Sequence, residues 1–161
     1  MAGDESQLDQ DVDTFWSLVF DIVSEAETRL ALHMAAYDLT PPQFFVLRTL
    51  WEHGGRCRIG VIADEHHLTN ATMTGLVKRL EAMDPPLVSR QRSLLDKRAV
   101  DVALTEAGSQ RYNSIHEGLR DQARVLLSLM TADQRSEILL KAQHYFTDFV
   151  AQFPIGHDHP E

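Results

Sequence analysis

Only three residues separate two helical patterns in the middle of this sequence, and so short a connection strongly limits the folds that the chain can adopt. Residues 59–65 form a short amphipathic pattern, and residues 66–68 separate it from the next one. Thr69 is a good N-cap for a helix that runs to about Met83, where the prolines at 85–86 must end it because proline lacks a backbone N–H. Two helices joined by so short a turn, with small polar residues opening the second, have the organisation of a helix-turn-helix.

A β-hairpin is predicted directly after these two helices. Residues 87–92 and 99–104 alternate apolar and polar side chains with a period of two, and they flank the polar stretch 93–98. Lysine and arginine side chains are frequent in and beside this stretch. The sequence therefore predicts a hairpin with a basic tip.

Long amphipathic helices are predicted on both sides of this middle section. Apolar residues recur there every three or four positions, which is typical of a helix with one buried face. The three stripes are Phe15, Val19, Ile22, Ala26, Leu30, His33 and Tyr37, then Leu119, Ala123, Leu126 and Met130, and finally Ile138, Ala142, Tyr145, Phe149 and Phe153. We expect the first helix to end near Asp38, and part of the burial of these stripes to occur across a homodimer.

Local signals mark the ends of the helices. Thr40, two prolines and Gln43 predict an N-cap with a capping box, and the glycines at 54–55 predict the end of the helix that it starts. Thr105 is expected to cap a later helix, and residues 131–134 form a second capping box. We expect the acidic start of the chain and its end, residues 156–161, to be disordered tails.

Length and charge limit the classes of function. A chain of 161 residues with 43% hydrophobic residues has room for one compact domain, and it has no apolar run long enough to cross a membrane. With no secretory signal pattern, a cytoplasmic location is expected. The net charge is −9, but residues 1–40 hold nine acids and one base, whereas residues 48–111 hold ten bases and eight acids. A local basic face matters more for DNA binding than the total charge.

The segment from Leu39 to Gly108 resembles the MarR (multiple antibiotic resistance regulator) family of winged helix-turn-helix transcription factors. The resemblance rests on residues 68–81 (LTNATMTGLVKRLE), which look like the recognition helix of that family, and on two parts of the wing signature: Asp96-Lys97-Arg98 and Leu104-Thr105-Glu106-Ala107-Gly108. It implies a mainly α fold with a small β-wing, in which the winged helix-turn-helix is flanked by long N- and C-terminal dimerisation helices.

The same resemblance implies a division of one MarR-like domain, 1–161. Residues 8–38 would form the N-terminal dimerisation helix, 39–108 the winged helix-turn-helix, 109–153 the C-terminal dimerisation helices and 154–161 a flexible tail. The turn after the recognition helix, at residues 84–88, is slightly longer than is usual in the family. The implied function is that of a sequence-specific transcriptional regulator, a repressor that binds a pseudo-palindromic double-stranded DNA operator as a homodimer.

Candidate DNA contacts fall on the recognition helix and on the hairpin. Short polar side chains at the start of the helix suit base edges in the major groove, and arginine at a hairpin tip suits the narrow, negative minor groove. Asp96 would hold Arg98 or a neighbouring arginine in position. The predicted DNA-binding residues are Asn70, Ala71, Thr72, Thr74, Gly75, Lys78, Arg79, Arg90, Arg92, Asp96, Lys97 and Arg98. The alternative is that these residues have no role in DNA binding: the helix is then only an amphipathic core helix, and the hairpin tip is only a solvated turn.

The family resemblance also implies control by a small aromatic or phenolic effector, bound between the dimerisation helices and the DNA-binding lobe. Large aromatic and imidazole side chains could line such a pocket, although each of them is also a common core residue. The candidate pocket residues are Trp16, Phe20, His33, Tyr37, Phe44 and Trp51.

Alternatives come from the histidines and from the single cysteine. His33, His53, His66 and His67 could suggest a metal-sensing regulator, but their spacing places no two histidines one turn apart on a helix face, so we predict no metal and no cofactor. Cys57 lies between two arginines that could make it reactive in redox sensing, but a small buried residue is favoured. No catalytic constellation emerges, so an enzyme is not expected. A winged-helix protein-interaction module without DNA binding is the alternative from another class.

Overall fold

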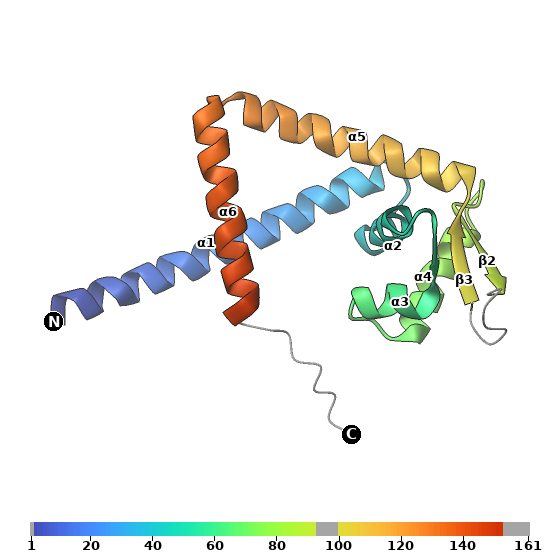
Figure 1. The fold of residues 1–161 in the computed structure, drawn as a ribbon, viewed down its shortest axis with the longest axis horizontal. Coiled ribbons are helices and arrows are strands. Elements are labelled where there is room, and N and C mark those ends of the chain that lie inside the picture. The colour runs from blue at the N-terminus through green and yellow to red at the C-terminus, as the bar shows by residue number, and fades with distance from the viewer. Residues whose placement is uncertain (1, 93–99, 153–161) are drawn as a thin grey trace, which may run out of the picture. The chain divides into compact units, whose positions relative to one another are not determined.

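The computed structural model describes residues 2–92 and 100–152, which are mainly helical (Figure 1). The chain divides into two compact units, Met1–His116 and Glu117–Glu161. The helices are α1 (Ala2–Ala35), α2 (Pro41–Glu52), α3 (Ile59–Glu65), α4 (Asn70–Glu81), α5 (Glu106–Ser128) and α6 (Ala132–Gln152). The strands are β1 (Arg56–Arg58), β2 (Val88–Arg92) and β3 (Val100–Leu104). The predicted fold class, mainly α with a small β-wing, is confirmed.

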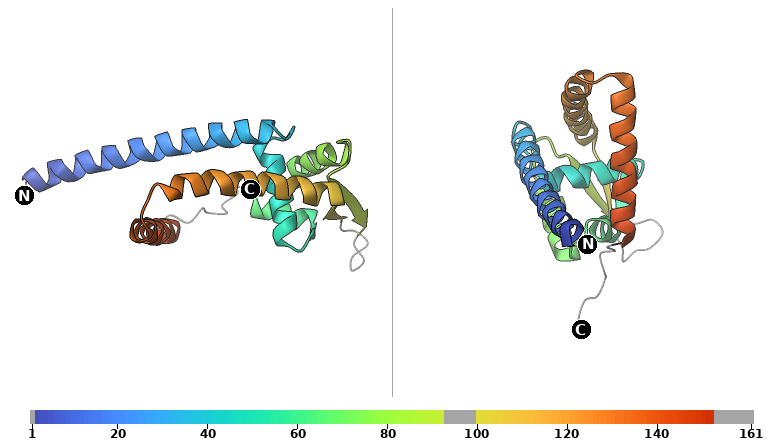
Figure 2. Two further views of the ribbon diagram at one scale, coloured as in Figure 1. Left: turned by 90° about the horizontal axis from the view of Figure 1, so that it is seen from above. Right: turned by 90° about the vertical axis from the view of Figure 1, so that its left-hand side faces the viewer.

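α1 is one unbroken helix that begins within the acidic start of the sequence (Figure 2). The expectation of a disordered tail there is wrong from residue 2 onward. Acidic residues favour the first turn of a helix because the helix dipole places partial positive charge at its N-terminus. The helix ends at Ala35, shortly before the expected end near Asp38. Asp38 has a φ of 56°, and the backbone N–H of Leu39 donates to the carbonyl of Met34 at 3.1 Å.

α2 begins and ends where the local signals predict. The backbone N–H of Thr40 donates to Oε1 of Gln43 at 2.9 Å, which is one half of a capping box. At the other end, Gly54 and Gly55 have φ values of 71° and 89°, a region that glycine adopts without strain. The N–H of Gly55 donates to the carbonyl of Leu50 at 2.7 Å, which closes the helix.

The predicted helix-turn-helix is confirmed. α3 ends at Glu65 and α4 begins at Asn70, with Thr69 as its N-cap. Oγ1 of Thr69 accepts a hydrogen bond from the backbone N–H of Thr72 at 3.2 Å. In the turn, His67 has a φ of 51°. The start of α4 is therefore fixed by its own cap as well as by the turn.

The sheet has three strands in the order β1-β3-β2, and both pairs are antiparallel. β2 and β3 form the predicted hairpin, while β1 adds an edge strand that the sequence analysis did not predict. Cys57 of β1 pairs with Val102 of β3, and both side chains are buried. The predicted apolar side of β3 is buried only at Val102, since Val100 is exposed and Leu104 is half-buried.

The turn between α4 and β2 is tied to the start of α5. Oγ1 of Thr105 donates to the carbonyl of Pro86 at 2.6 Å and accepts from the N–H of Gly108 at 3.0 Å. A Cβ atom at Gly108 would lie 1.9 Å from the carbonyl oxygen of Leu87, so this position has no room for a side chain. The glycine of the wing signature is thus a packing requirement, because α5 must pass close to the backbone at residue 87.

A single hydrophobic core lies behind α4 in the first unit. Each large apolar side chain fully buried there contributes about 1.5–3 kcal/mol relative to leaving it in water. The largest fully buried side chains include Leu47, Leu50, Ile62, Met73, Leu80, Leu87, Val102 and Ile115. They come from α2, α3, α4, α5, β3 and the turn before β2, so the helix-turn-helix and the hairpin pack on one core.

The second unit contains the last part of α5, from Glu117 onward, and the whole of α6. The capping box at residues 131–134 is confirmed: the Thr131 N–H donates to Oε1 of Gln134 at 2.9 Å, and the Gln134 N–H donates to Oγ1 of Thr131 at 3.3 Å. The residues of the predicted apolar stripe from Ile138 to Phe149 are exposed, and its last member, Phe153, lies outside the described residues. Among the helices that the structure describes, none is both long enough and apolar enough to cross a bilayer.

Candidate nucleic-acid interface

α4 has one buried face and one open face. Met73, Leu76, Val77 and Leu80 are buried in the core. The predicted DNA-binding residues of the helix lie on the remaining surface: Asn70, Ala71, Thr72, Lys78 and Arg79 are exposed, and Thr74 and Gly75 are half-buried. The structure therefore brings all seven predicted residues of the helix onto the side of α4 that the core does not use.

The hydroxyl groups at the start of α4 are partly engaged within the helix. Oγ1 of Thr72 lies 2.9 Å from Oγ1 of Thr69, and Oγ1 of Thr74 donates to the carbonyl of Asn70 at 2.7 Å. A hydroxyl whose proton is already donated can still accept a hydrogen bond. Thr74 can therefore accept from a base amine or present its methyl group, while Asn70 keeps an exposed amide that can both donate and accept.

Gly75 is not required by the fold. A Cβ atom built at this position meets nothing within 4 Å, and the residue has no positive φ. Glycine inside a helix is about 1 kcal/mol less favourable than alanine. The absence of a side chain here leaves open space on the exposed side of α4, which would admit another molecule close to the helix backbone.

Arg90 and Arg92 lie on β2 in different surroundings. Arg90 forms an ion pair with Glu81 at the end of α4: its Nε donates to Oε2 at 2.7 Å and its backbone N–H donates to Oε1 at 3.2 Å. These bonds from Arg90 hold the pKa of Glu81 below its usual range. Arg92 is exposed at the end of the strand. The ion pair links the recognition helix to the wing, a role that sequence reasoning did not assign to Arg90.

The remaining predicted wing residues, Asp96, Lys97 and Arg98, lie outside the described residues. The base of the hairpin carries another charged contact that the sequence analysis missed. Arg56 of β1 donates from Nε to Oδ2 of Asp101 at 3.1 Å, which ties the edge strand to β3. Only the tertiary pairing of β1 with β3 brings these two side chains together, so no local signal could have found the contact.

The histidines and the cysteine lie in structural contacts. Nε2 of His66 is 2.8 Å from Oγ1 of Thr49, and Nε2 of His53 is 2.7 Å from Oε1 of Glu65. Over residues 2–92 and 100–152, no group of three potential metal ligands is found.

Cys57 is buried, as favoured, and burial is the main cause that raises the pKa of its thiol. The neighbouring arginines thus do not produce the lowered pKa that redox sensing would need.

The six candidate pocket residues form three groups rather than one. Trp16 stacks on Phe20 within α1, with ring centroids 5.7 Å apart, and both are exposed. His33 and Tyr37 lie 5.5 Å apart. Both also reach the backbone of α5, His33 at the carbonyl of Ile115 and Tyr37 at the carbonyl of Ser114.

The third group is built around a residue that the sequence analysis missed. Phe44 and Trp51 both stack on Tyr112 of α5, with centroid distances of 5.9 and 5.1 Å, and His116 stacks on the same ring at 5.6 Å. Tyr112 lies in a helical stripe, but the predicted apolar face of that helix began further along, at Leu119. A hollow of about 310 Å³ beside Trp51 is lined by Gly54, Gly55, Leu104 and Ser109.

Comparison with known proteins shows a shared fold and a match to one family model. Residues 39–100, which contain the helix-turn-helix and reach the first residue of β3, match the model of the MarR family. This segment of the chain is similar to the MarR family. The solved structure of a MarR family protein from Bacillus stearothermophilus shares its fold, with a TM-score of 0.76 over 88% of this chain and 97% of that one at 23% identity. A second structure, of a MepR-like protein complexed with pseudoligands, has a TM-score of 0.57 and 28% identity, and covers 86% of this chain and 95% of its own.

Curated MarR-family relatives are transcriptional regulators. The chain is 28% identical to the HTH-type transcriptional repressor MdtR of Bacillus subtilis over 69% of its own length and 67% of that protein. It is 39% identical to the HTH-type transcriptional regulator MgrA of Staphylococcus aureus over 44% of its own length and 46% of MgrA. The match thus spans about half of MgrA. These relatives support a DNA-binding regulator.

Proposed function

We propose that this protein is a ligand-responsive repressor that binds a pseudo-palindromic operator as a homodimer. In this proposal, α4 enters the major groove and the hairpin of β2 and β3 reaches the adjacent minor groove. Residues 8–38 and 109–153 supply the dimerisation helices of one domain. The site residues are the twelve predicted from the sequence, including Asp96, Lys97 and Arg98 in the segment that joins β2 to β3.

The observation that carries the proposal is the division of α4 into two faces. Four apolar side chains hold the helix on the core, while Asn70, Thr72 and Lys78 are exposed. Gly75 leaves open space on the unburied side, where the fold makes no use of it. A helix that reads DNA needs short polar groups near its start for base edges and cations further along for phosphates, and α4 has both.

Homodimer formation is supported by the apolar side chains of the outer helices. Among the residues whose burial the structure describes, α1 carries nine exposed large hydrophobic side chains and α6 carries six. So many exposed large hydrophobic side chains are unusual for a monomeric protein, and large exposed apolar patches usually mark an interface. Two copies related by a two-fold axis would present two recognition helices to half-sites about one helical turn apart.

The relatives support the finer parts of the proposal. MdtR is described as a repressor, and the MepR-like protein is complexed with pseudoligands. A small aromatic or phenolic effector would act on this chain by preferring a spacing of the recognition helices that does not fit the operator. The groups around Tyr112 and beside His33 provide aromatic side chains that such an effector could contact.

The experiment is fluorescence anisotropy with a duplex from upstream of the protein's own gene and with a scrambled duplex, across a salt series. We expect preferential binding of the native duplex near physiological salt and a steep fall of affinity as salt rises, because cationic side chains release counterions from DNA. Equal and salt-labile binding of both duplexes would contradict a specific operator at that position. No binding at low salt would favour a protein-interaction module.

A matched pair of variants separates the recognition helix from general charge effects. Lys78→Gln removes one cation per subunit from the exposed side of α4, so two per dimer, and should reduce the slope of log affinity against log salt by about 2. Arg29→Gln removes one cation from α1, where Arg29 forms an exposed ion pair with Glu25, and should leave the slope unchanged. If both variants changed the slope equally, α4 would not be the DNA contact.

A further inference from the structure

β1 carries two arginines on the same face of the sheet. Arg56 and Arg58 flank the buried Cys57, and alternate residues of a strand point to the same face. Arg56 has a partner, since its guanidinium lies 3.0 Å from Oδ2 of Asp101. Arg58 stands directly opposite Asp101 in the strand register and is exposed. Among the residues that the structure describes, however, no carboxylate lies at ion-pair distance from Arg58.

Position 58 is an unfavourable place for an arginine. Arg58 is the N-cap of α3, and its side chain makes no cap hydrogen bond. Serine, threonine, aspartate and asparagine are preferred at an N-cap because their side chains accept from backbone N–H groups of the first turn. A cation is also unfavourable next to the partial positive charge at a helix N-terminus. The start of α3 therefore gains no stability from this arginine, as is expected of a residue with a role outside the fold.

The strand register places Arg58 near the end of the sheet that is proposed to reach DNA. β2 ends at Arg92 and β3 begins at Val100, and these two residues are paired. Arg58 is paired with Asp101, the next residue of β3, so it lies only about 3.3 Å along the strands from the last pair. Arg56 lies two residues further from this end of the sheet.

Arg58 also lies close to the start of the recognition helix. Gly60, two residues further along the chain, is in the first turn of α3, and a Cβ atom built there would lie 3.8 Å from Oδ1 of Asn70. Asn70 is the first residue of α4 and is exposed. Arg58 is therefore a neighbour of two elements: the start of α4, proposed to enter the major groove, and the end of the hairpin, proposed to reach the minor groove.

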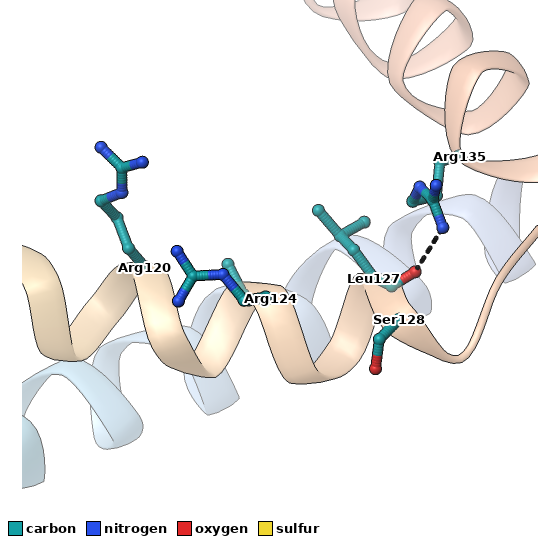
Figure 3. A pocket seen from close by; sticks show the side chains of 6 residues that line it. Arg120, Arg124, Leu127, Ser128 and Arg135 are labelled. Carbon is teal, nitrogen blue, oxygen red and sulfur yellow. Dashed lines mark hydrogen bonds between the residues drawn. The ribbon is translucent and has the colours of Figure 1, made fainter. Parts of the chain in front are cut away.

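Arginines of the second unit have different surroundings. Figure 3 shows Arg120, Arg124 and Arg135 on α5 and α6. Arg124 pairs with Asp121, and a terminal nitrogen of Arg135 donates to the carbonyl of Met130 at 2.7 Å. These helices belong to the proposed dimerisation region. Their arginines are therefore not candidates for the surface that faces DNA.

We infer that Arg58 binds the sugar–phosphate backbone that separates the major groove entered by α4 from the minor groove reached by the hairpin. The inference rests on the proposed function, because it requires both elements to lie in adjacent grooves. The strand of phosphates between two adjacent grooves passes the protein surface between the two elements, where Arg58 lies. Its planar guanidinium fork can bind two phosphate oxygens. Since every DNA sequence has the same phosphates, Arg58 adds affinity without adding base preference.

The test is fluorescence anisotropy of Arg58→Ser with the native and the scrambled duplex across a salt series. One contact is lost per subunit, so the slope of log affinity against log salt should fall by about 2 per dimer, and the affinity for both duplexes should fall about tenfold or more. The ratio of the two affinities should not change. Because serine can cap α3, the midpoint of urea unfolding at the same protein concentration should be unchanged or higher.

Two further variants complete the test. Arg58→Lys keeps the charge and should keep a salt slope close to that of the unaltered chain. Arg48→Gln is the matched control, since it removes another exposed arginine of the first unit, which pairs with Glu52 at 2.9 Å. Arg48 lies on α2 near Tyr112 of α5, in neither of the elements assigned to a groove. The control should leave the salt slope unchanged.

The outcomes distinguish this inference from the function on which it rests. If the unaltered chain binds neither duplex, both are overturned. If it binds DNA and Arg58→Ser has the same salt slope, or if Arg48→Gln lowers the slope equally, only the contact of Arg58 with phosphate is overturned. A larger loss for the native than for the scrambled duplex would place Arg58 on base edges instead. A lower urea midpoint with unchanged DNA affinity in Arg58→Ser would assign the arginine to the fold.

Discussion

Trp16 and Trp51 are exposed to nearly the same extent, 45% and 44%, yet they lie in opposite kinds of surroundings. Trp51 belongs to the winged helix, where it stacks on Tyr112 beside a packed core. Trp16 lies on α1, where its ring neighbours, Phe15 and Phe20, are themselves exposed. The winged helix thus completes its own core, whereas α1 and α6 carry apolar surface that this single chain does not cover.

The winged helix and the outer helices differ in the source of their stability. In the winged helix, stability comes from contacts within the chain, so its unfolding should not depend on protein concentration. In the outer helices, the free energy of burying the exposed apolar side chains is released only on contact with a partner. For an obligate dimer, stability and protein concentration cannot be separated.

The largest effect is expected at Gly108, where the winged helix is packed most tightly. A Cβ atom there would lie 1.9 Å from the carbonyl oxygen of Leu87, so Gly108→Ala must displace backbone and should lower the free energy of unfolding by about 3 kcal/mol. Gly75→Ala is the matched control, since its Cβ meets nothing within 4 Å and should stabilise α4 by up to about 1 kcal/mol. Urea unfolding of both variants measures the difference. Equal stability of the two would show that the approach of α5 to Leu87 is not a constraint.

The two tryptophans provide the next test. Trp16→Ala should weaken the proposed dimer by about tenfold or more, because large aromatic side chains dominate interfaces. Trp51→Ala should leave the dimer intact and lower the stability of the winged helix by about 1–2 kcal/mol. Sedimentation velocity over a range of concentrations reports the first effect, and thermal unfolding at fixed concentration reports the second. A Trp16→Ala protein that dimerises as well as the unaltered chain would remove α1 from the interface at this position.

A smaller effect is expected for DNA binding at Gly75. Its open space would be filled by a methyl group in Gly75→Ala, which should lower operator affinity about tenfold while the fold becomes no less stable. Anisotropy with the operator and urea unfolding on the same preparation measure the two quantities. The control is Gly55→Ala in the loop after α2, where a positive φ predicts a loss of stability without a specific loss of DNA affinity. Unchanged affinity of Gly75→Ala would place the DNA away from this part of α4.

The smallest effect concerns the link between α4 and the wing. Arg90 holds the pKa of Glu81 below its usual range, so the pair contributes stability above the pKa of an unfolded glutamate and loses it as pH falls through the lower, folded pKa. Glu81→Gln should therefore reduce stability by a few tenths of a kcal/mol at pH 7, and the difference should vanish in acid. Chemical unfolding at pH 7 and at acidic pH measures both values. Glu52→Gln, which breaks the more exposed pair with Arg48, is the control and should have less effect on the wing.

Local sequence signals predict most of the first unit because its elements are marked by their own residues. The bounds of α3 follow from its amphipathic pattern, and α2, α4 and α5 begin where Thr40, Thr69 and Thr105 predict. The faces of α4 were also predictable, since its apolar and polar positions follow the helical period.

Features that depend on distant pairing were missed. β1 is only three residues long, with two arginines around Cys57, and it becomes a strand because β3 supplies its hydrogen-bond partners. The Arg90–Glu81 pair likewise forms only when β2 packs beside α4. The start of α1 also differs from the prediction. An acidic segment is typical of a disordered tail, but acidic residues also stabilise the N-terminus of a helix.

Gly75 also bears on how this fold could be given a new target. A Cβ atom added at this position meets nothing within 4 Å, whereas Met73 and Leu76 are buried in the core on the other side of α4. Because an added Cβ atom there meets nothing within 4 Å, a change at this position can act on DNA binding without a clash inside the fold. For protein engineering, this makes position 75 a natural site for a combinatorial library in which altered DNA preference is selected without a parallel search for restored stability.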